Sequence, residues 1–475
     1  MFCSLWTLLF LARGSMAFGW RPSGWGASGG RPSQWHAPHQ EPLDAIIIGG
    51  GSAGTYTAIQ LQKANKSLAL IETQPRLGGH VNTYIDPYTN RTIDYGVQIF
   101  QNISVVRDYF SYLDIPIETA TFGGDTKTID LATKEVVTLD YGAIYAGLFE
   151  ALPRFQAQQD KYPYLDNGFN LPSLVPEDLL LPFGEWLDKY NLSNVAYTLW
   201  QYDQGSGNLL DQPVLYVLKY SNRQSIANLA GGGYIQTVRR DNQEIYDHAL
   251  EKLKDSTHLS STVLDVQRSN GCVRVLVSTP QGKRFLEAKQ LVLAIPPKIE
   301  NLHFLDLNQE ELGIFRQFNN SYYWNALLRN TGLPDNTSVG YIDSRAPLTI
   351  PAQPSTYIIS STGVAGLHSV FYGSDTYVPD EEVQNLMAEV ARNAVKTLGL
   401  PPSGDMRFEG FHSHSPFVLT VPTDTIRDGF YSRAEALQGM RNTWYTGAAW
   451  QAQDSSAIWN FTEMVVLPRL LERLG

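Results

Sequence analysis

The stretch "DAIIIGGGSAGTYTAIQL", residues 44–61, decides the fold of this chain. Aliphatic residues 45–48 lead directly into glycines 49–51, and apolar residues then recur at helical spacing over 53–61. The pattern predicts a strand that turns abruptly into a helix. Because the turn carries no side chains, another group is expected to lie against it.

The turn matches the pattern G-x-G-x-x-G at Gly49, Gly51 and Gly54. In this pattern the glycines allow a tight turn, close approach of a diphosphate and packing of the helix on the strand, while the helix N-terminus faces the phosphates. Glu72 ends the next predicted strand, 67–72, at 23 positions after Gly49 (72 − 49). A spacing of roughly 20 residues suits an acid that binds a ribose hydroxyl. The combination predicts a dinucleotide without choosing between NAD and FAD; a turn without a ligand is the alternative.

Length and composition describe a globular protein. The chain has 475 residues, of which 43% are hydrophobic, and its length corresponds to two or three domains at roughly 150 residues each. The net charge is −11 and the sequence has no run of Lys or Arg, so a phosphate backbone would be repelled. Nucleic-acid binding is therefore not expected.

The N-terminal region resembles a targeting segment. Residues 1–17 contain a short apolar run followed by small residues and are predicted to be a signal peptide, and 18–42 form a Gly/Pro/Ser-rich flexible lead-in. No later stretch is long enough for a transmembrane span. Removal of the signal would leave Cys272 alone, which excludes an intrachain disulfide. We expect the secretory pathway as the location, since seven sequons occur, at Asn65, Asn90, Asn102, Asn191, Asn319, Asn336 and Asn460.

The order of predicted elements indicates an α/β protein. After the opening strand, helix and strand, the middle region of about 100–225 looks mostly helical with long loops. Strand patterns resume at about 262–297, and a second mixed block follows over 301–405 with a helix near 380–398. A βαβ order of this kind favours a parallel sheet with ligands at the carboxyl ends of its strands.

Three further motifs carry a family resemblance. They are "RLGGH" at 76–80, "GFYSRAEALQGMRNTWYTGAAW" at 429–450 and "AQDSSAIWNF" at 452–461. The sequence resembles the flavin-containing amine oxidase superfamily and, within it, the β-cyclopiazonate dehydrogenase group of fungal flavoproteins. The resemblance implies a glutathione-reductase-like, Rossmann-type FAD-binding domain with an inserted mixed α+β substrate domain. The FAD-binding domain would comprise residues 43–100, 226–300 and 406–475, and the substrate domain 101–225 and 301–405.

The resemblance also implies which residues hold the cofactor FAD. Gly49, Gly51, Ser52, Ala53 and Gly54 would hold the diphosphate and Glu72 the ribose, with Gly78, Gly79 and His80 beside the cofactor and the Val263 backbone at the adenine. Gly447, Ala448, Ser456, Ala457 and Ile458 would approach the flavin, with the helix that begins near Ser456 directing N–H groups at its N1 and O2 atoms.

Aromatic residues are candidates for a substrate wall. Trp324, Tyr372, Trp450 and Trp459 could place flat faces over the flavin, with Trp450 favoured because it follows the Gly-Ala turn. Gln98 could bind the flavin ring or the substrate. For each aromatic the alternative is an ordinary place in the core, and for Gln98 it is that of a buried, hydrogen-bonded amide.

The sequence departs from the family pattern in ways that affect the chemistry. His80 stands where many members have Arg, and residues 322–330 lack the Lys that holds a water near flavin N5 in many oxidases. The electron acceptor is therefore open between oxygen and another compound. His412 and His414 could share a metal, but no third ligand stands at suitable spacing, so no metal is expected. The letters of the hydrolase motif G-x-S-x-G occur at 50–54, but Ser52 stands inside the glycine turn, where it is expected to face phosphate, so a hydrolase is disfavoured.

These observations predict an FAD-dependent oxidoreductase. It would take a hydride from a C–N or C–H bond of an apolar, amine- or indole-containing small molecule in secondary metabolism. The first alternative is a secreted amine or L-amino-acid oxidase that makes hydrogen peroxide, and the second is a non-catalytic FAD-binding protein.

Overall fold

The computed structural model describes residues 41–121, 124–269 and 271–475, and residues 41–475 form one compact unit. The predicted signal peptide, 1–17, and the lead-in up to residue 40 lie outside the described residues.

The first sheet contains the strand of the opening motif. Residues 45–48 are buried on both faces, which explains their continuous apolar run. Neighbours β12, β1, β2 and β9 are parallel, β20 is parallel to β12, and β10, β11 and β12 are antiparallel. The order of the sheet is β10 (Thr262–Ser269), β11 (Cys272–Thr279), β12 (Gly282–Leu293), β1 (Leu43–Ile48), β2 (Leu68–Ile71) and β9 (Thr257–His258), with β20 (Thr443–Tyr445) beside β12.

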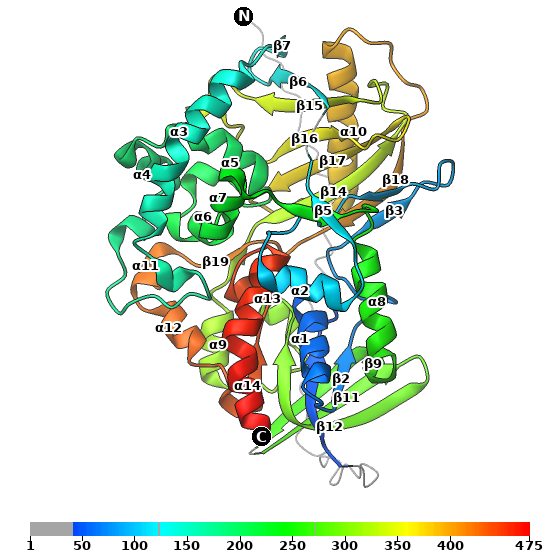
Figure 1. Cartoon of the computed structure of the whole chain (residues 1–475), viewed down its shortest axis with the longest axis vertical. Helices are drawn as coiled ribbons and strands as arrows, with labels where there is room; N and C mark the ends of the chain where they lie inside the picture. Colours follow the sequence, from blue (N-terminus) through cyan, green and yellow to red (C-terminus); the bar gives the residue numbers. More distant parts are fainter. Residues whose placement is uncertain (1–40, 122–123, 270) are drawn as a thin grey trace, which may run out of the picture. The chain divides into compact units, whose positions relative to one another are not determined.

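Helix α1 (Ser52–Lys63) follows the glycine turn and is buried along most of its length. It packs against β1, against α8 (Gln243–Leu253) and against α13 (Ser455–Phe461) (Figure 1). Asn65, just beyond its last residue, has φ 56°, a left-handed conformation that Asn tolerates at a helix end. The C-terminal region of the chain thus covers the motif that opens the domain.

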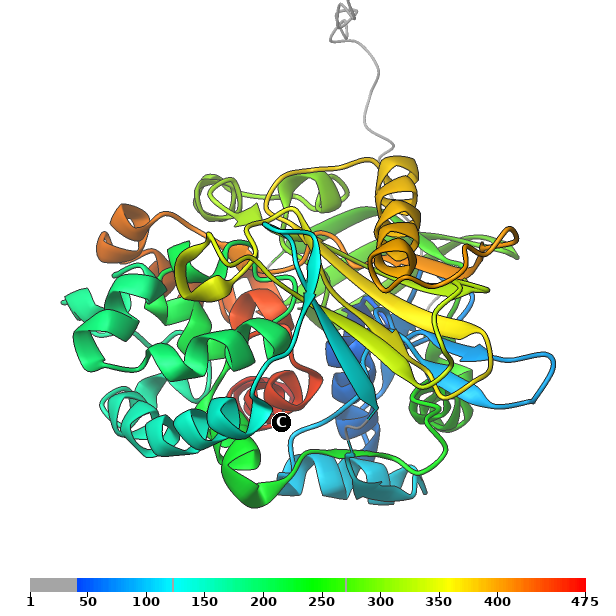
Figure 2. The same ribbon diagram turned by 90° about the horizontal axis from the view of Figure 1, so that it is seen from above.

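The second sheet is mostly antiparallel, and one face lies under α10 (Asp380–Thr397). Val383, Met387 and Ala391 of α10 join the buried residues of this sheet in one hydrophobic cluster, and the helix runs across the strands in Figure 2. The order is β18 (Arg407–Ser413), β14 (Tyr322–Arg329), β17 (Leu367–Ser374), β16 (Ser355–Ser361), β15 (Thr337–Ile342), β6 (Asp125–Asp130) and β7 (Glu135–Val137).

The remaining elements are helices and short two-stranded sheets. The helices of the middle region are α2 (Ser104–Tyr112), α3 (Tyr141–Gln159), α4 (Phe183–Tyr190), α5 (Ala196–Tyr202), α6 (Val214–Tyr220) and α7 (Arg223–Ala227). Later helices are α9 (Gln309–Phe315), α11 (Thr423–Arg427), α12 (Phe430–Glu435) and α14 (Leu467–Leu474). The short sheets pair β3 (Thr83–Ile85) with β4 (Thr92–Asp94), β5 (Ile117–Thr119) with β8 (Ile235–Thr237), and β13 (Asn319–Asn320) with β19 (Leu419–Thr420).

The predicted α/β class and the mainly helical middle region agree with these elements, although strands β5, β6 and β7 also occur there. The domain boundaries stay a prediction. One element bears on them, since β18, which begins after the expected boundary at 405/406, pairs with β14 in the second sheet. Among the described residues no helix is both long and apolar enough to cross a membrane.

Candidate cofactor and substrate site

The glycine turn has the backbone geometry that its sequence predicts. Gly49 has φ +104°, a conformation that side chains disfavour, and a Cβ on Gly54 would lie 1.8 Å from the Gly49 carbonyl oxygen. A Cβ on Gly51 would meet nothing nearer than the Gly79 Cα, at 3.8 Å. Gly49 and Gly54 are thus required by the turn itself, whereas a Cβ on Gly51 would make only an ordinary contact with Gly79.

A second glycine segment lies opposite this turn. Gly78 has φ +117° and Gly79 φ +56°, and a Cβ on Gly79 would lie 3.1 Å from the Gly51 Cα. The Gly78 N–H donates to the Gly50 carbonyl at 2.9 Å and fixes the two segments together. Two stretches of bare backbone therefore pack directly against each other, and a diphosphate can lie along them without meeting a side chain.

Glu72 lies at this turn and directs its carboxylate into it. The Gly50 N–H donates to Oε2 at 2.6 Å, and the Gln74 N–H donates to Oε1 at 2.7 Å. The carboxylate is 8% exposed, so it is held in place beside the turn as the spacing predicted. Its carbonyl oxygen accepts the Ser261 N–H, which brings the start of β10, and with it buried Val263, to the same end of the sheet.

The start of α1 offers unused donors. Its N-cap residue, Gly51, has no side chain to cap the helix, so the first N–H groups are free to bind an anion. Ser52 Oγ is buried and makes no hydrogen bond of ordinary geometry. The hydroxyl group of Tyr246 lies near it. A buried hydroxyl beside an uncapped helix and a bare backbone cradle fits a phosphate group of FAD.

The Gly-Ala turn of the C-terminal motif reaches the same place. Gly447 has φ +113°, and a Cβ on it would lie 3.9 Å from Ala53 Cβ at the start of α1. Gly447, which the resemblance places at the flavin, therefore lies beside the start of α1 although nearly 400 positions separate it from Ala53 in sequence (447 − 53 = 394).

The start of α13 is capped within the chain. Asp454 caps this helix by accepting the Ala457 N–H at 2.8 Å through its side chain and the Ile458 N–H at 2.9 Å through its carbonyl. The Ser456 hydroxyl accepts the Gln101 N–H at 2.9 Å. Burial raises the pKa of Asp454. The N–H groups of Ala457 and Ile458 are thus already bound, and the expected approach of Ser456, Ala457 and Ile458 to the flavin stays a prediction.

A cavity of about 30 Å³, space for one or two water molecules, lies against this turn. It is bounded by residues of α6 on one side and by Ala448 and 451–453 on the other. Apolar and aromatic side chains form most of its wall, namely Phe169, Tyr216, Val217, Tyr220, Val418 and Leu419, and its polar lining is Ser206, Gln212, Lys219, Gln451 and Gln453.

His80 lies in an aromatic stack. Its ring is 4.7 Å from that of His414 and 6.2 Å from that of Phe417, with both pairs nearly parallel. Burial, and to a smaller extent the charge of His412, lower the pKa of His80 to about 4. His80 is therefore neutral at physiological pH and does not replace the cation that an Arg would bring.

The structure corrects the expectation for Trp324 and Tyr372. Both belong to the hydrophobic cluster under α10, and the Trp324 indole N–H donates to Asp380 Oδ1 at 2.9 Å. Side chains alternate along a strand, so the next residue, Tyr323, points to the other face. Its ring lies 4.9 Å from Phe417 and 5.8 Å from His414, next to the stack that holds His80.

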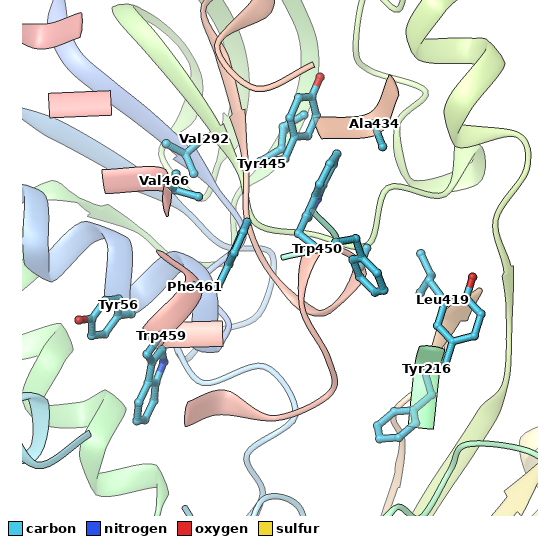
Figure 3. Packing of buried hydrophobic residues seen from close by; sticks show 14 of the residues in the cluster. Tyr56, Tyr216, Val292, Leu419, Ala434, Tyr445, Trp450, Trp459, Phe461 and Val466 are labelled. Atoms are coloured by element: carbon cyan, nitrogen blue, oxygen red, sulfur yellow. The ribbon is translucent and has the colours of Figure 1, made fainter. Parts of the chain in front are cut away.

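The other three substrate-wall candidates are also placed elsewhere. Trp450 is 6% exposed and its ring packs 5.1 Å from that of Tyr445 in the core (Figure 3). Trp459 is fully buried and donates its indole N–H to the Ser52 carbonyl at 3.2 Å, so it fixes α13 on α1. Gln98 is exposed and donates to the Asp94 carbonyl at 3.0 Å.

Two glutamines that the sequence did not single out take positions near the turn. Gln451, next to Trp450, lines the cavity, and buried Gln101 donates to Asp454 Oδ2 at 3.1 Å. The only signal for Gln451 was its place beside Trp450 in the C-terminal turn, where periodicity does not determine which side chain faces the site. Gln101 had no comparable signal in the sequence.

The two alternating histidines do not form a metal centre. His414 is buried and bonded to Asn82, while His412 is exposed. Within residues 41–121, 124–269 and 271–475, no group of three or more His, Cys, Asp or Glu side chains is arranged to hold a metal ion.

Comparisons with known proteins fit this site. Residues 47–113 match the family model "NAD(P)-binding Rossmann-like domain". The FAD-dependent oxidoreductase oblC of Cochliobolus heterostrophus is 36% identical over 446 residues, which cover 91% of this chain and 92% of that protein. The β-cyclopiazonate dehydrogenase of Aspergillus flavus is 31% identical over 436 residues, covering 91% and 94%. The chain belongs to this family of FAD-dependent oxidoreductases.

FAD is thus the cofactor of this enzyme, and the cradle described above suits it. Solved structures show the same amine-oxidase-like fold. The fatty acid isomerase of P. acnes superimposes with a TM-score of 0.73 at 19% identity, over 90% of this chain and 98% of that one. A putrescine oxidase variant superimposes with a TM-score of 0.65 at 15% identity, over 91% and 99%.

Proposed function

We propose that this oxidoreductase takes a hydride from a C–N or C–H bond of an apolar, amine- or indole-containing small molecule in secondary metabolism. The observation that carries the proposal is the cavity against the Gly447 turn, with its mainly aromatic and aliphatic wall. Related enzymes of similar length that are named FAD-dependent oxidoreductases or β-cyclopiazonate dehydrogenase support it.

FAD supplies the hydride-accepting ring, and the protein supplies orientation and a dry site. Phe169, Tyr216 and Leu419 exclude water from one side of the cavity. The Ser206 hydroxyl and the Gln212 and Gln453 amides can orient a polar group of the substrate. A wall of this composition suits a largely apolar molecule with few polar atoms, and its side chains must move apart to admit one, because the cavity itself holds only one or two water molecules.

The structure disfavours the L-amino-acid oxidase alternative. That activity needs a cation that contacts the substrate carboxylate directly. Lys219 is the only cation in the described lining of the cavity, and its ammonium already donates to three oxygen atoms of the protein. We therefore favour a substrate without an amino-acid carboxylate.

Two finer points belong to the same proposal. We propose that the FAD-binding domain has the glutathione-reductase-like fold that the resemblance implies. We also retain secretion, because the sequon residues Asn65, Asn90, Asn191, Asn319 and Asn336 are exposed, whereas Asn460 is half-buried and bonded to Asn167. Mass spectrometry of the protein from a fungal culture medium tests secretion and glycosylation together.

Anaerobic flavin reduction tests the function. The purified holoenzyme is mixed with indole alkaloids, apolar amines and simple amino acids, and the oxidised-flavin absorbance is followed. We expect bleaching by one of the first two classes and none by the amino acids. Peroxide production with simple amino acids would favour the oxidase alternative. A flavin that no compound reduces, alongside reduction by dithionite, would favour the non-catalytic alternative.

A further inference from the structure

Lys219 is the most unusual charged residue of the cavity. It lies in the last turn of α6, among the buried residues of that helix, and is only 2% exposed. Its Nζ lies 2.6 Å from the Leu165 carbonyl oxygen, 2.8 Å from that of Gly168 and 2.7 Å from Gln451 Oε1. Its side chain therefore ends among oxygen atoms next to the turn that meets the cofactor site.

The three contacts identify the protonation state of Lys219. Burial lowers the pKa of this residue well below its ordinary value. However, three oxygen acceptors at these distances need three N–H donors, which only the ammonium form has. The Phe169 ring, whose centroid is 4.8 Å from Nζ, also favours a cation. The geometry thus holds a full positive charge in the wall.

Among the residues that the structure describes, no carboxylate lies at contact distance to neutralise this charge. The Asp166 carboxylate interacts with the Lys219 ammonium only through long-range electrostatics, and it forms an ion pair with Arg223 at 3.0 Å. The two other buried acids in this part of the chain, Asp203 and Asp454, have raised pKa values because of burial, that of Asp203 reaching about 8. No Asp or Glu is found in the described lining of the cavity.

A buried charge of this kind is costly, since removing an ion from water without an ionic partner is unfavourable. The carbonyl dipoles stabilise the ammonium but do not cancel its net charge. In a low-dielectric cavity that charge acts strongly on whatever enters. An ammonium substrate would be repelled, whereas a neutral or anionic one would not.

From this arrangement, and on the basis of the proposed function, we infer that Lys219 sets the charge selectivity of the site: its substrate binds uncharged, as an indole or the free base of an amine, or as an anion. Lys219 does this through its field, because its N–H groups are occupied by Leu165, Gly168 and Gln451. It is therefore a specificity-determining residue and not a substrate ligand.

Three indole probes with tails of similar length test the inference. They are tryptamine, which is a cation, indole-3-propionamide, which is neutral, and indole-3-propionate, which is an anion. Binding to the oxidised holoenzyme is measured anaerobically at neutral pH by perturbation of the flavin absorbance and by calorimetry. We expect the neutral and anionic probes to bind at least tenfold more tightly than tryptamine. Equal or tighter binding of tryptamine, or binding of none of the three probes, would overturn the inference.

Variants separate the field of Lys219 from the net charge of the protein. In Lys219→Met the preference against tryptamine should shrink to less than threefold, whereas Lys219→Arg should retain it. Lys283→Met, which removes an exposed charge on β12, should behave as the wild type. If Lys219→Met does not fold, Lys219→Gln gives the same comparison, and the order of the three probes on the wild type stands as a test without any variant. A preference that survives both substitutions would contradict the inference.

This test is independent of the proposed function. Binding of the probes needs no hydride transfer, so the charge order can hold even if no compound bleaches the flavin. Conversely, bleaching by an amine that binds as an ammonium would support the function and contradict the role of Lys219.

Discussion

The carboxylate of Glu72 accepts the backbone N–H of Gly50 at 2.6 Å, which joins the end of β2 to the glycine turn after β1. The link is formed by a buried charge and a peptide group at the point where two parallel strands end. It places the acid where a sugar next to the bound phosphates can reach it.

Replacement of Glu72 by Gln should weaken FAD binding. A hydrogen bond to a charged group contributes about 1.5–3 kcal/mol, so the dissociation constant should rise roughly 10- to 100-fold. Fluorescence titration of the deflavinated protein with FAD measures this change. Glu310→Gln, at an exposed position of α9, is the control and should leave the affinity unchanged. Equal affinities for the Glu72 variant and the wild type would remove Glu72 from the cofactor site.

Gly51→Ala should separate folding from cofactor binding. Gly51 has φ −73° and its Cβ would make only an ordinary contact with the Gly79 Cα, at 3.8 Å, so the substitution should change the unfolding free energy by no more than about 1 kcal/mol. The new methyl group would occupy the space of the phosphates, and FAD affinity should fall at least tenfold. Denaturant unfolding and FAD titration give the two values. Gly313→Ala is the control, because a Cβ there meets no neighbour, and it should lower neither the stability nor the FAD affinity. Unchanged FAD affinity in Gly51→Ala would contradict the placement of the diphosphate at the glycine turn.

Tyr323 and Trp324 should respond oppositely to substitution. Trp324→Phe removes a buried hydrogen bond to Asp380 and part of the packing under α10, so it should cost about 1–3 kcal/mol of stability with little effect on flavin reduction. Tyr323→Leu should slow flavin reduction several-fold, because the ring beside His414 and Phe417 is lost. Stopped-flow reduction with an active substrate and urea unfolding measure both effects. The reverse pattern would restore Trp324 to the substrate wall.

Asp203 should make stability depend on pH. Burial raises its pKa from 3.8 to about 8, so the folded state retains a proton that the unfolded state has lost. The stability that this group contributes is fully present below about pH 4 and is lost as the pH rises through about 8. Asp203→Asn should therefore flatten the decrease in unfolding free energy between pH 5 and 8 by an amount on the order of a few kcal/mol. Asp211→Asn, at an exposed position, should retain the decrease, and an identical slope in Asp203→Asn would refute the assignment.

Much of the first sheet could be predicted because its signals are local. Residues 44–48, the glycine turn and Glu72 lie within one βαβ unit, where short-range spacing determines geometry. The resemblance placed Gly447 at the flavin, which stays a prediction, whereas its position beside Ala53 is known from the structure alone.

The substrate wall could not be predicted in the same way. Trp324 and Tyr323 are neighbours on one strand, and which of them faces the site depends on the face that α10 covers, a helix more than 50 positions later. The same question arises for Trp450 and Gln451, of which the first packs in the core and the second lines the cavity. They lie in a turn, where periodicity does not predict which side chain faces the site. The cap on α13 depends on Asp454, whose role was hidden because an Asp before a helix can either cap it or leave its N–H groups to a ligand.

The most direct test is an experimental structure of the protein with FAD. We predict the diphosphate at the start of α1, against the backbone of Gly51 and Gly79, the ribose hydroxyls on Glu72, and the flavin ring beside Gly447 and the cavity of Lys219. A diphosphate bound elsewhere, or a Glu72 carboxylate that makes no contact with the ribose, would contradict the account.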